Sequence, residues 1–420
     1  MNLLVKNAII IDKNSKLHRK KRDVLITKGK IVKIAASIKN ENNYKEIKKS
    51  NLHISAGWFD GSVSFGEPGY EDRETIENGL FVAAKSGFTG VAVNPITNPV
   101  VDNHIAVRFL VNASNDNITD LYPIGSLTKK AAGEEMAEMY DMKEAGAIAF
   151  SDYKRAVKNP NLLKVSMRYA QAFDGLIMSH PQDHHIANDG VANESPNMMH
   201  IGLKGNPNLA EELQITRDLH ILAYTGGRLH IPTITTKESV KLIKDAQKSG
   251  LQVTCSVAAH HLVLTDDLLE DYNSSYKVNP PLRSKKDCKA LQKGVKDGVI
   301  SFITSDHRPI DIEDKKKEFS LAKDGTIGLE SFFGAVNSVL ELDDLIENIT
   351  SKPRRVYNLE TVEIKEGNVA NLTFFNPDID WIFTRESILS SSHNSAFIGE
   401  MMKGEVYGVF NNNRLRVEGL

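Results

Sequence analysis

Hydrophobic and polar residues alternate at both ends of the chain in the way that is typical of β-strands. The strand-like runs are Leu3–Ile11, Asp23–Ile26, Ile31–Ile34, Val369–Phe375, Gly404–Phe410 and Arg414–Val417. Polar turns separate them. Because the two ends of a chain usually lie close together on a domain surface, we expect residues 1–54 and 363–420 to form one small β-sandwich.

The middle of the chain alternates between strand-like and helix-like segments. Arg228–Ile234 predicts a strand, and Thr235 and Glu238 have the spacing of a capping box at the start of a helix. Apolar residues at helical spacing follow, and then Gln252–Ala258 predicts the next strand. Further predicted strands are Gly90–Val93, Ala147–Phe150, Gly175–Met178 and Ile300–Thr304. Repeated βα units of this kind predict an α/β fold, a TIM-type (β/α)8 barrel over residues 55–362.

Composition excludes several classes of protein. The 420 residues include 52 basic and 54 acidic side chains, and this balance argues against a nucleic-acid binder. The two cysteines, Cys255 and Cys288, cannot build a disulfide scaffold and fit a reducing compartment. No apolar run approaches the roughly 18 residues that cross a bilayer. We therefore expect a cytoplasmic protein that binds neither nucleic acid nor membrane.

In an α/β barrel, functional residues lie where strands end. The polar segments that follow the predicted strands are Asp60–Gly69, Asn94–Pro99, Phe150–Asp152, Ser179–Asp183, Leu229–Thr233, Ala259–His261, Asn279–Arg283 and Thr304–Pro309. Three of them carry specific motifs, namely Glu67-Pro68-Gly69, Asn279-Pro280-Pro281-Leu282-Arg283 and Ser305-Asp306-His307-Arg308-Pro309. In this order and spacing, the motifs resemble those of the dihydroorotases of the amidohydrolase superfamily.

The resemblance covers nearly the whole chain. It implies a (β/α)8 barrel with a β-sandwich built from both termini, and a zinc enzyme that interconverts carbamoyl aspartate and dihydroorotate in pyrimidine synthesis. It also implies roles for individual residues. Asp152 stands at the bridging carboxylate, His180 at a ligand histidine, and Asp306 at a metal ligand that is also the general base. Asn279 and Gly325 stand at substrate-binding positions.

The sequence departs from the family where the metal should bind. The family's Asp-x-His-x-His reads Asp60-Gly61-Ser62-Val63-Ser64, and a later ligand histidine falls on Thr233. Residues two apart on a strand share a face, so Ser62 and Ser64 should point inward together. By the same rule, His230 should face away from Thr233 and cannot replace it. Zinc sites take three or four His, Cys or carboxylate ligands, so we predict no cofactor.

The substrate anchors of the family are also changed. Its carboxylate-binding arginine is Gly66, the asparagine of its Pro-Asn-Thr motif is Ile96, and its histidine after Asp-His-x-Pro is Ile310. Arg283 and Arg308 are candidate replacements, and one hypothesis is that Arg308, beside Asp306, neutralises the pocket. Without these anchors, binding of the family's dicarboxylate substrate is not expected.

The remaining histidines have simpler interpretations. His260 and His261 are expected to end a strand with structural hydrogen bonds, and the pair His184–His185 is expected to be solvated. Without its metal partners, His180 is interpreted as a pocket histidine held by hydrogen bonds. Asp152 would need internal donors, because an unpaired buried carboxylate is costly.

Three functional hypotheses follow. The leading one is a non-catalytic dihydroorotase homologue that scaffolds aspartate transcarbamoylase, as inactive members of the family do in some bacteria. The alternative is an active dihydroorotase or related cyclic amidohydrolase, with zinc on Asp152, His180 and Asp306 and with Asp306 as the base. The third is a ligand-binding module that keeps Asn279 and the glycine loop. The family resemblance also makes a homodimer possible.

Overall fold

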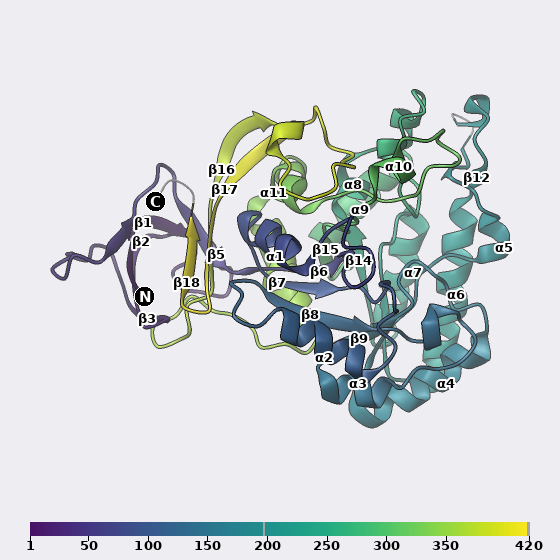
Figure 1. Cartoon of the computed structure of the whole chain (residues 1–420), viewed down its shortest axis with the longest axis horizontal. Coiled ribbons are helices and arrows are strands. Elements are labelled where there is room, and N and C mark those ends of the chain that lie inside the picture. The colour runs from purple at the N-terminus through teal and green to yellow at the C-terminus, as the bar shows by residue number, and fades with distance from the viewer. Residues whose placement is uncertain (196–197, 418–420) are drawn as a thin grey trace.

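A barrel of parallel strands forms the centre of the computed structural model, which describes residues 1–195 and 198–417 (Figure 1). Its strands are β6 (Trp58–Val63), β7 (Phe88–Val93), β8 (Asp120–Gly125), β9 (Ala149–Ser151), β10 (Leu176–Met178), β13 (Arg228–Ile231), β14 (Val253–Ala258) and β15 (Phe302–Thr304). They lie in the order β15-β14-β13-β10-β9-β8-β7-β6. The amide of Ser64 donates to the carbonyl of His307 at 2.8 Å, which brings the two end strands together. The predicted (β/α)8 barrel is confirmed.

Helices surround the barrel (Figure 1). They are α1 (Ile76–Lys85), α2 (His104–Ala113), α3 (Met139–Ala145), α4 (Pro160–Ala170), α5 (His184–Ala187), α6 (Asn208–Thr225), α7 (Lys237–Lys248), α8 (Ala259–Val263), α9 (Lys285–Lys296), α10 (Ile312–Lys315), α11 (Leu329–Asn337), α12 (Leu342–Ile349) and α13 (Ser351–Val356). Short 3₁₀ turns lie at Lys129–Ala131, Gln171–Phe173, Met199–Ile201, Asp266–Leu269, Ser274–Tyr276 and Arg385–Ser387, and β11 (Ala192–Asn193) pairs with β12 (Gly205–Asn206). In the part of the chain that the structure describes, no helix has the length and apolar character to cross a membrane.

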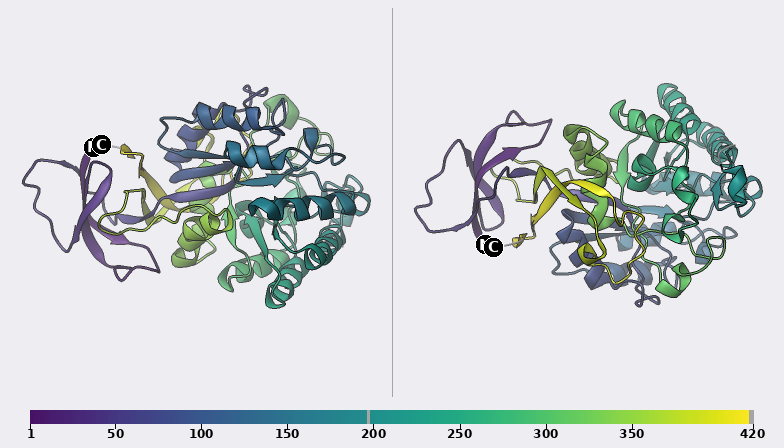
Figure 2. Two further views of the ribbon diagram at one scale, coloured as in Figure 1. Left: turned by 90° about the horizontal axis from the view of Figure 1, so that it is seen from below. Right: turned by 90° about the horizontal axis from the view of Figure 1, so that it is seen from above.

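Both ends of the chain build a second sheet. Its strands are β1 (Asn2–Ile10), β2 (Lys21–Thr27), β3 (Lys30–Ala35), β4 (Lys45–Ile47), β5 (His53–Ala56), β16 (Leu372–Ile382), β17 (Met401–Asn411) and β18 (Arg414–Val417). They form one hydrogen-bonded path, β18-β17-β16-β5-β1-β2-β3, with β4 beside β1. The N-terminal ammonium of Met1 donates to Asn413 Oδ1, in the turn between β17 and β18, at 2.7 Å. Figure 2 shows the N-terminal strands, in purple, at one end of the molecule. A sheet made from both termini is confirmed, whereas the domain boundaries, 1–54 with 363–420 against 55–362, stay a prediction.

An aromatic cluster joins this sheet to the barrel. β5 ends at Ala56 and β6 begins at Trp58, so the two sheets follow each other almost without a linker. The Trp58 ring is fully buried and lies 5.5 Å from the ring of Phe375 on β16 and 4.9 Å from that of Phe333 on α11. Its indole nitrogen donates to Ser55 Oγ at 2.9 Å, so the buried polar group of the tryptophan has a partner.

The predicted βα unit around residue 235 is correct in outline and wrong in one detail. β13 ends at Ile231, earlier than expected, because Thr233 has a φ of 53° and leaves the extended conformation. The residue that caps α7 is Thr236, whose hydroxyl accepts from the amide of Ser239 at 3.0 Å. Thr235, predicted to be the cap, instead donates its hydroxyl to the buried Glu211. A competing carboxylate therefore displaced the N-cap of α7 by one residue from the predicted position.

Candidate functional site

The first side of the barrel mouth holds a neutral hydrogen-bond network. The side-chain amide of Asn94, which follows β7, donates to the hydroxyl of Ser62 at 3.0 Å and to that of Ser64 at 3.3 Å. The two hydroxyls therefore lie together, as their spacing predicted. Asp60 lies behind them and accepts from the amides of Ser62 and Ser305, both at 3.1 Å. Its complete burial raises the pKa of this carboxyl to about 7.

Neutral donors hold the carboxylate of Asp152, which follows β9. Ser126 Oγ donates to Oδ1 at 2.8 Å, and Thr128 donates its amide to Oδ1 at 2.9 Å and its hydroxyl to Oδ2 at 2.5 Å. Burial raises the pKa of Asp152 and these bonds oppose the rise. The internal donors that the sequence required are thus present. They come from the end of β8, a strand that the sequence analysis did not predict.

A cation neutralises the buried carboxylate of Asp306, which follows β15. The ammonium of Lys154 lies 2.7 Å from Oδ2, and the phenol of Tyr153 donates to Oδ1 at 3.0 Å. Both side chains of the ion pair are nearly inaccessible, with 8% and 1% exposure. Arg308 was a candidate for this role, but its guanidinium pairs with Asp324 instead. The cation paired with Asp306 is therefore Lys154, and Arg308 acts on Asp306 only from a greater distance.

Sequence reasoning missed Tyr153 and Lys154, although they directly follow Asp152. The period-two rule applies only inside a strand. β9 ends at Ser151, and Tyr153 has a φ of 56°. The chain therefore turns back at this point and brings two consecutive side chains to Asp306. The available signal was a lysine within two residues of a predicted ligand carboxylate.

His180, after β10, is buried and not fully held by hydrogen bonds. Its Nε2 atom is buried and has no hydrogen-bond partner among the described residues. The prediction of a histidine held by hydrogen bonds is therefore wrong for this nitrogen. Burial is the main cause that lowers the pKa of His180 to about 4, and the nearby Lys154 ammonium acts in the same direction. The imidazole is consequently neutral at neutral pH.

The region of Thr233 offers no imidazole to the mouth. The ring of His230 is buried and stacks on Phe302, with ring centroids 4.9 Å apart. Its nitrogens lie 2.9 Å from Thr254 Oγ1 and 3.0 Å from Ser256 Oγ. Both nitrogens therefore have partners, and burial lowers the pKa of His230 to about 3. Since β13 ends at Ile231, the alternation used to compare His230 with Thr233 does not extend that far.

The paired histidines differ from each other. His184 and His185 are exposed on α5, as predicted. His260 and His261 lie on the short helix α8, directly after β14. The Nε2 atom of His261 lies 3.0 Å from the carbonyl of Pro280, whereas neither ring nitrogen of His260 has a partner among the described residues. The expected structural hydrogen bonds therefore exist for His261 and not for His260.

The positions of the substrate anchors are closed or occupied. A Cβ atom added to Gly66 would lie 1.8 Å from the carbonyl oxygen of Tyr70, so this backbone has no room for a side chain there. Ile310 is buried, with 1% exposure. Arg283 is not a replacement. Its buried guanidinium binds Thr235 Oγ1, Asn193 Oδ1 and the carbonyl of Asn206, and it therefore belongs to the scaffold.

The glycine loop is retained next to Arg308. The amide of Gly325 donates to the carbonyl of Lys277 at 2.9 Å, and an added Cβ would lie 3.0 Å from Arg308 Cδ. Gly325 has a φ of 138°, which favours glycine. Asn279, two residues after Lys277, is half-buried. These two positions keep the family's residue types, and their role in substrate binding stays a prediction.

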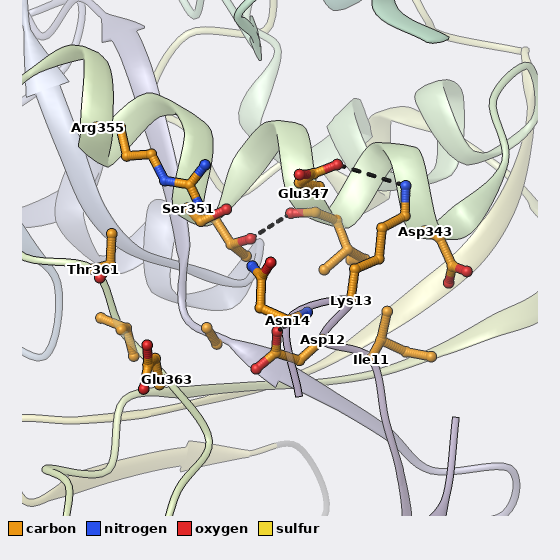
Figure 3. A pocket seen from close by; sticks show the side chains of 14 residues that line it. Ile11, Asp12, Lys13, Asn14, Asp343, Glu347, Ser351, Arg355, Thr361 and Glu363 are labelled. Atoms are coloured by element: carbon orange, nitrogen blue, oxygen red, sulfur yellow. Dashed lines mark hydrogen bonds and ion pairs between the residues drawn. The ribbon is translucent and has the colours of Figure 1, made fainter. Parts of the chain in front are cut away.

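A cavity also lies at the end of the barrel opposite the mouth. It holds about 110 Å³ between residues 11–14 and helices α12 and α13, and Ala56 is part of its wall (Figure 3). Lys13 reaches across it to Glu347 at 3.5 Å. Because Ala56 precedes β6, this cavity lies at the N-terminal end of the strands. In TIM barrels, that end serves stability and the C-terminal end carries the site.

The fold defines the general class. A barrel of this type, joined to a sheet from both termini, is also found in solved hydantoinases. Among solved structures, L-hydantoinase (dihydropyrimidinase) from Arthrobacter aurescens has a TM-score of 0.87 at 22% identity, covering 99% of this chain and 96% of its own. A D-hydantoinase has a TM-score of 0.84 at 19% identity, covering 99% and 95%. At this identity the likeness concerns the fold.

Sequence comparison defines the family. A dihydro-orotase-like family model matches residues 53–239. The dihydroorotase of Ruminiclostridium cellulolyticum is 37% identical over 412 residues, and that of Pelotomaculum thermopropionicum is 38% identical over 411 residues. Each alignment covers 96% of both chains. The chain belongs to the dihydroorotase family, as its motifs indicated.

The residues of the mouth do not fit the zinc ions that the family implies. Within residues 1–195 and 198–417, no group of three His, Cys, Asp or Glu side chains is placed to hold a metal ion. Asp152 has both oxygens in hydrogen bonds with neutral donors. Asp306 has an ammonium group at 2.7 Å, and a positive charge at that distance opposes binding of a cation to the same carboxylate.

Proposed function

We propose that this chain is a non-catalytic member of the dihydroorotase family, acting in pyrimidine biosynthesis as a structural or regulatory partner of aspartate transcarbamoylase. The observation that carries the proposal is the buried ion pair between Lys154 and Asp306. In the family, the carboxylate at this position binds metal and serves as the general base. Here each oxygen already accepts one hydrogen bond, Oδ1 from Tyr153 and Oδ2 from Lys154, and the ammonium of Lys154 occupies a position beside the carboxylate that a metal ion would need.

The missing ligands support the same proposal. Zinc makes hydroxide available at neutral pH by lowering the pKa of its bound water from 15.7 to about 7. Hydroxyl groups at Ser62, Ser64 and Thr233 are poor ligands for that ion. Loss of a single residue behind a ligand typically costs about 10–100-fold in affinity or activity. Three replaced ligands should therefore remove the activity altogether.

Metal analysis and turnover test the loss of catalysis. Protein purified without chelator and soaked in zinc should hold less than about 0.1 equivalents of metal and should not turn over dihydroorotate. Stoichiometric zinc together with turnover would overturn the proposal. A variant with Ser62→His, Ser64→His, Thr233→His and Lys154→Ala should gain zinc. The matched variant that keeps Lys154 should gain much less, because the ammonium still competes for Asp306.

The partner requires a separate test. Inactive family members that accompany aspartate transcarbamoylase supply the reason for this choice. The full chain and the transcarbamoylase of the same organism should co-purify and should form a complex of defined mass in light scattering. The absence of a complex at micromolar concentrations would rule out this role and would leave the loss of catalysis untouched.

One observation favours the alternative of an active cyclic amidohydrolase with a reduced site. The buried Nε2 atom of His180 is without a partner and could bind a metal together with Asp152 and Asp306. Turnover of dihydroorotate with added zinc that disappears in Asp306→Ala would support this function. Turnover that is unchanged in Asp306→Ala would identify a contaminating enzyme.

A further inference from the structure

A polar cleft opens on the second side of the barrel mouth, over the ends of β8, β9 and β10. It holds about 340 Å³. Residues 131–133 close one side, and the polar side chains of the lining are those of Asp152, Lys154, Arg155, Lys158, His180, Gln182 and His184. Neutral donors already engage Asp152 from behind, as described above. The groups that are free to face a ligand are therefore mainly basic.

The charges of this cleft do not balance. Lys154 is paired with Asp306, and Asp152 is the other carboxylate at the site. Arg155 donates to the carbonyls of Lys130 and Ala131 at 3.5 and 3.2 Å. Within the described residues, no ion pair joins Arg155 or Lys158 to a carboxylate. Three cations thus face two carboxylates, and both unpaired cations are exposed to the cleft.

A buried polar atom also points to a missing ligand. His180 is 3% exposed and lines the cleft, and its Nε2 has no partner in the described part of the chain. Leaving a buried polar group without a partner costs about 1–3 kcal/mol. A ligand with an acceptor atom in the cleft would remove this cost at His180.

The cleft is not the place where the family's substrate anchors stood. Those anchors fall on Gly66, Ile96 and Ile310, which follow β6, β7 and β15. Gly66 has no space for a side chain, and Ile310 is buried. The basic residues of the cleft follow β9 instead. Recognition of an anion would therefore take place on the other side of the mouth, with two basic residues, Arg155 and Lys158, that the family pattern does not include.

We propose that this cleft binds a small anion carrying a carboxylate or phosphate group. Arg155 and Lys158 hold the charged oxygens, and His180 Nε2 donates to the anion from the buried wall. Guanidinium and ammonium groups are the usual partners of such oxygens, and charge-assisted bonds are about twice as strong as neutral ones. The proposal rests on the proposed function in one respect, since no metal ion supplies the positive charge.

Calorimetric titration of the full chain with inorganic phosphate and with succinate tests this inference. The protein is first treated with chelator, and sodium chloride at matched ionic strength corrects for screening. We expect saturable binding of at least one of the two anions. Comparison of the two titrations shows which group is preferred. Arg155→Gln and Lys158→Gln should each weaken binding by about fivefold or more. Lys248→Gln, on the exposed end of α7 and outside the cleft, should not change it.

The outcomes separate this inference from the proposed function. The anion site would be overturned if the heat of titration with phosphate and succinate were the same as that with sodium chloride at matched ionic strength. It would also be overturned if the Arg155→Gln, Lys158→Gln and Lys248→Gln variants bound the anion with equal affinity. Binding that needs added zinc and survives Arg155→Gln would show that a metal holds the anion, which would overturn the proposed function as well. Lys158 is exposed and has no side-chain hydrogen bond among the described residues, so Lys158→Gln should fold normally.

Discussion

The family's metal-ligand positions differ between the two sides of the barrel mouth in the groups that now hold them. Around β6 and β7, the amide of Asn94 bridges the neutral hydroxyls of Ser62 and Ser64. Around β9 and β15, the groups are ionic, and Lys154 binds Asp306. Where hydroxyls stand in place of the family's imidazoles, a single side-chain amide supplies their hydrogen bonds. Where carboxylates stayed, buried donors and a cation were required, because a buried carboxylate without partners is costly.

The largest effect is expected on the ionic side. Lys154→Met should lower the free energy of unfolding by about 3–5 kcal/mol, because it leaves Asp306 buried without its counterion. Urea denaturation measures this loss. Lys317→Met, which breaks the more exposed pair with Asp314, should cost at most about 1 kcal/mol. Adding Asp306→Asn to Lys154→Met should recover most of the loss. A loss no larger than that of Lys317→Met would contradict the comparison.

A second prediction concerns the charge of Lys315, a buried lysine behind the barrel mouth, in the folded protein. The ammonium of Lys315 is buried and donates to the carbonyls of Lys277 and Lys323, both at 3.1 Å. Burial is the main cause that lowers its pKa from 10.5 to about 7. Between these pH values the unfolded chain holds a proton that the folded chain has lost, so folding becomes more favourable as the pH rises.

The stability of wild type relative to Lys315→Met should therefore rise by about 2–3 kcal/mol between pH 7 and pH 9. Below pH 7 the difference should be nearly constant, because the lysine is then charged in both states. Denaturation at each pH measures it. Lys316→Met removes an exposed neighbour and should show no such trend. A flat difference for Lys315→Met would show that its ammonium stays charged in the folded protein.

The smallest effects compare neutral bonds on the two sides. Thr128→Val removes a hydroxyl that binds Asp152 and also accepts from the amide of Gly133, and it should cost about 1–3 kcal/mol. Ser62→Ala should cost at most about 1 kcal/mol, because the Asn94 amide keeps Val63 and Ser64 as acceptors. Urea midpoints of the two variants decide this. Equal losses of stability in Thr128→Val and Ser62→Ala would show that hydrogen bonds on the two sides of the mouth contribute alike.

Hydrophobic patterning predicted most of the framework. The terminal strands were recognised because their β-branched residues alternate, and the barrel was recognised from its βα repeats. β8 was missed because Asp120–Gly125 contains a proline and begins with a charge, and both are unusual inside a strand. Missing β8 also hid Ser126 and Thr128, the donors to Asp152.

The site was less predictable than the framework. Replacement of the ligand residues could be read from Ser62, Ser64 and Thr233 because the motifs around them are intact. The hydrogen-bond and ion-pair partners of the surviving carboxylates could not be predicted, since these partners depend on how the chain turns after a strand. Tyr153 adopts a positive φ, and this single turn directs Lys154 to Asp306. Arg308, which lies only two residues after Asp306 in the sequence, binds Asp324.

The pairing of β5 with β16 has a consequence for synthesis on the ribosome. His53–Ala56 pairs with residues 372–375. At about 5–20 residues per second, the two partners emerge roughly 15–65 s apart. Until β16 arrives, one edge of β5 stays open, and an open edge can pair with another nascent chain. A shortened product that ends between Thr304 and Leu372 would keep this edge permanently, so it should aggregate even though every barrel strand has been made.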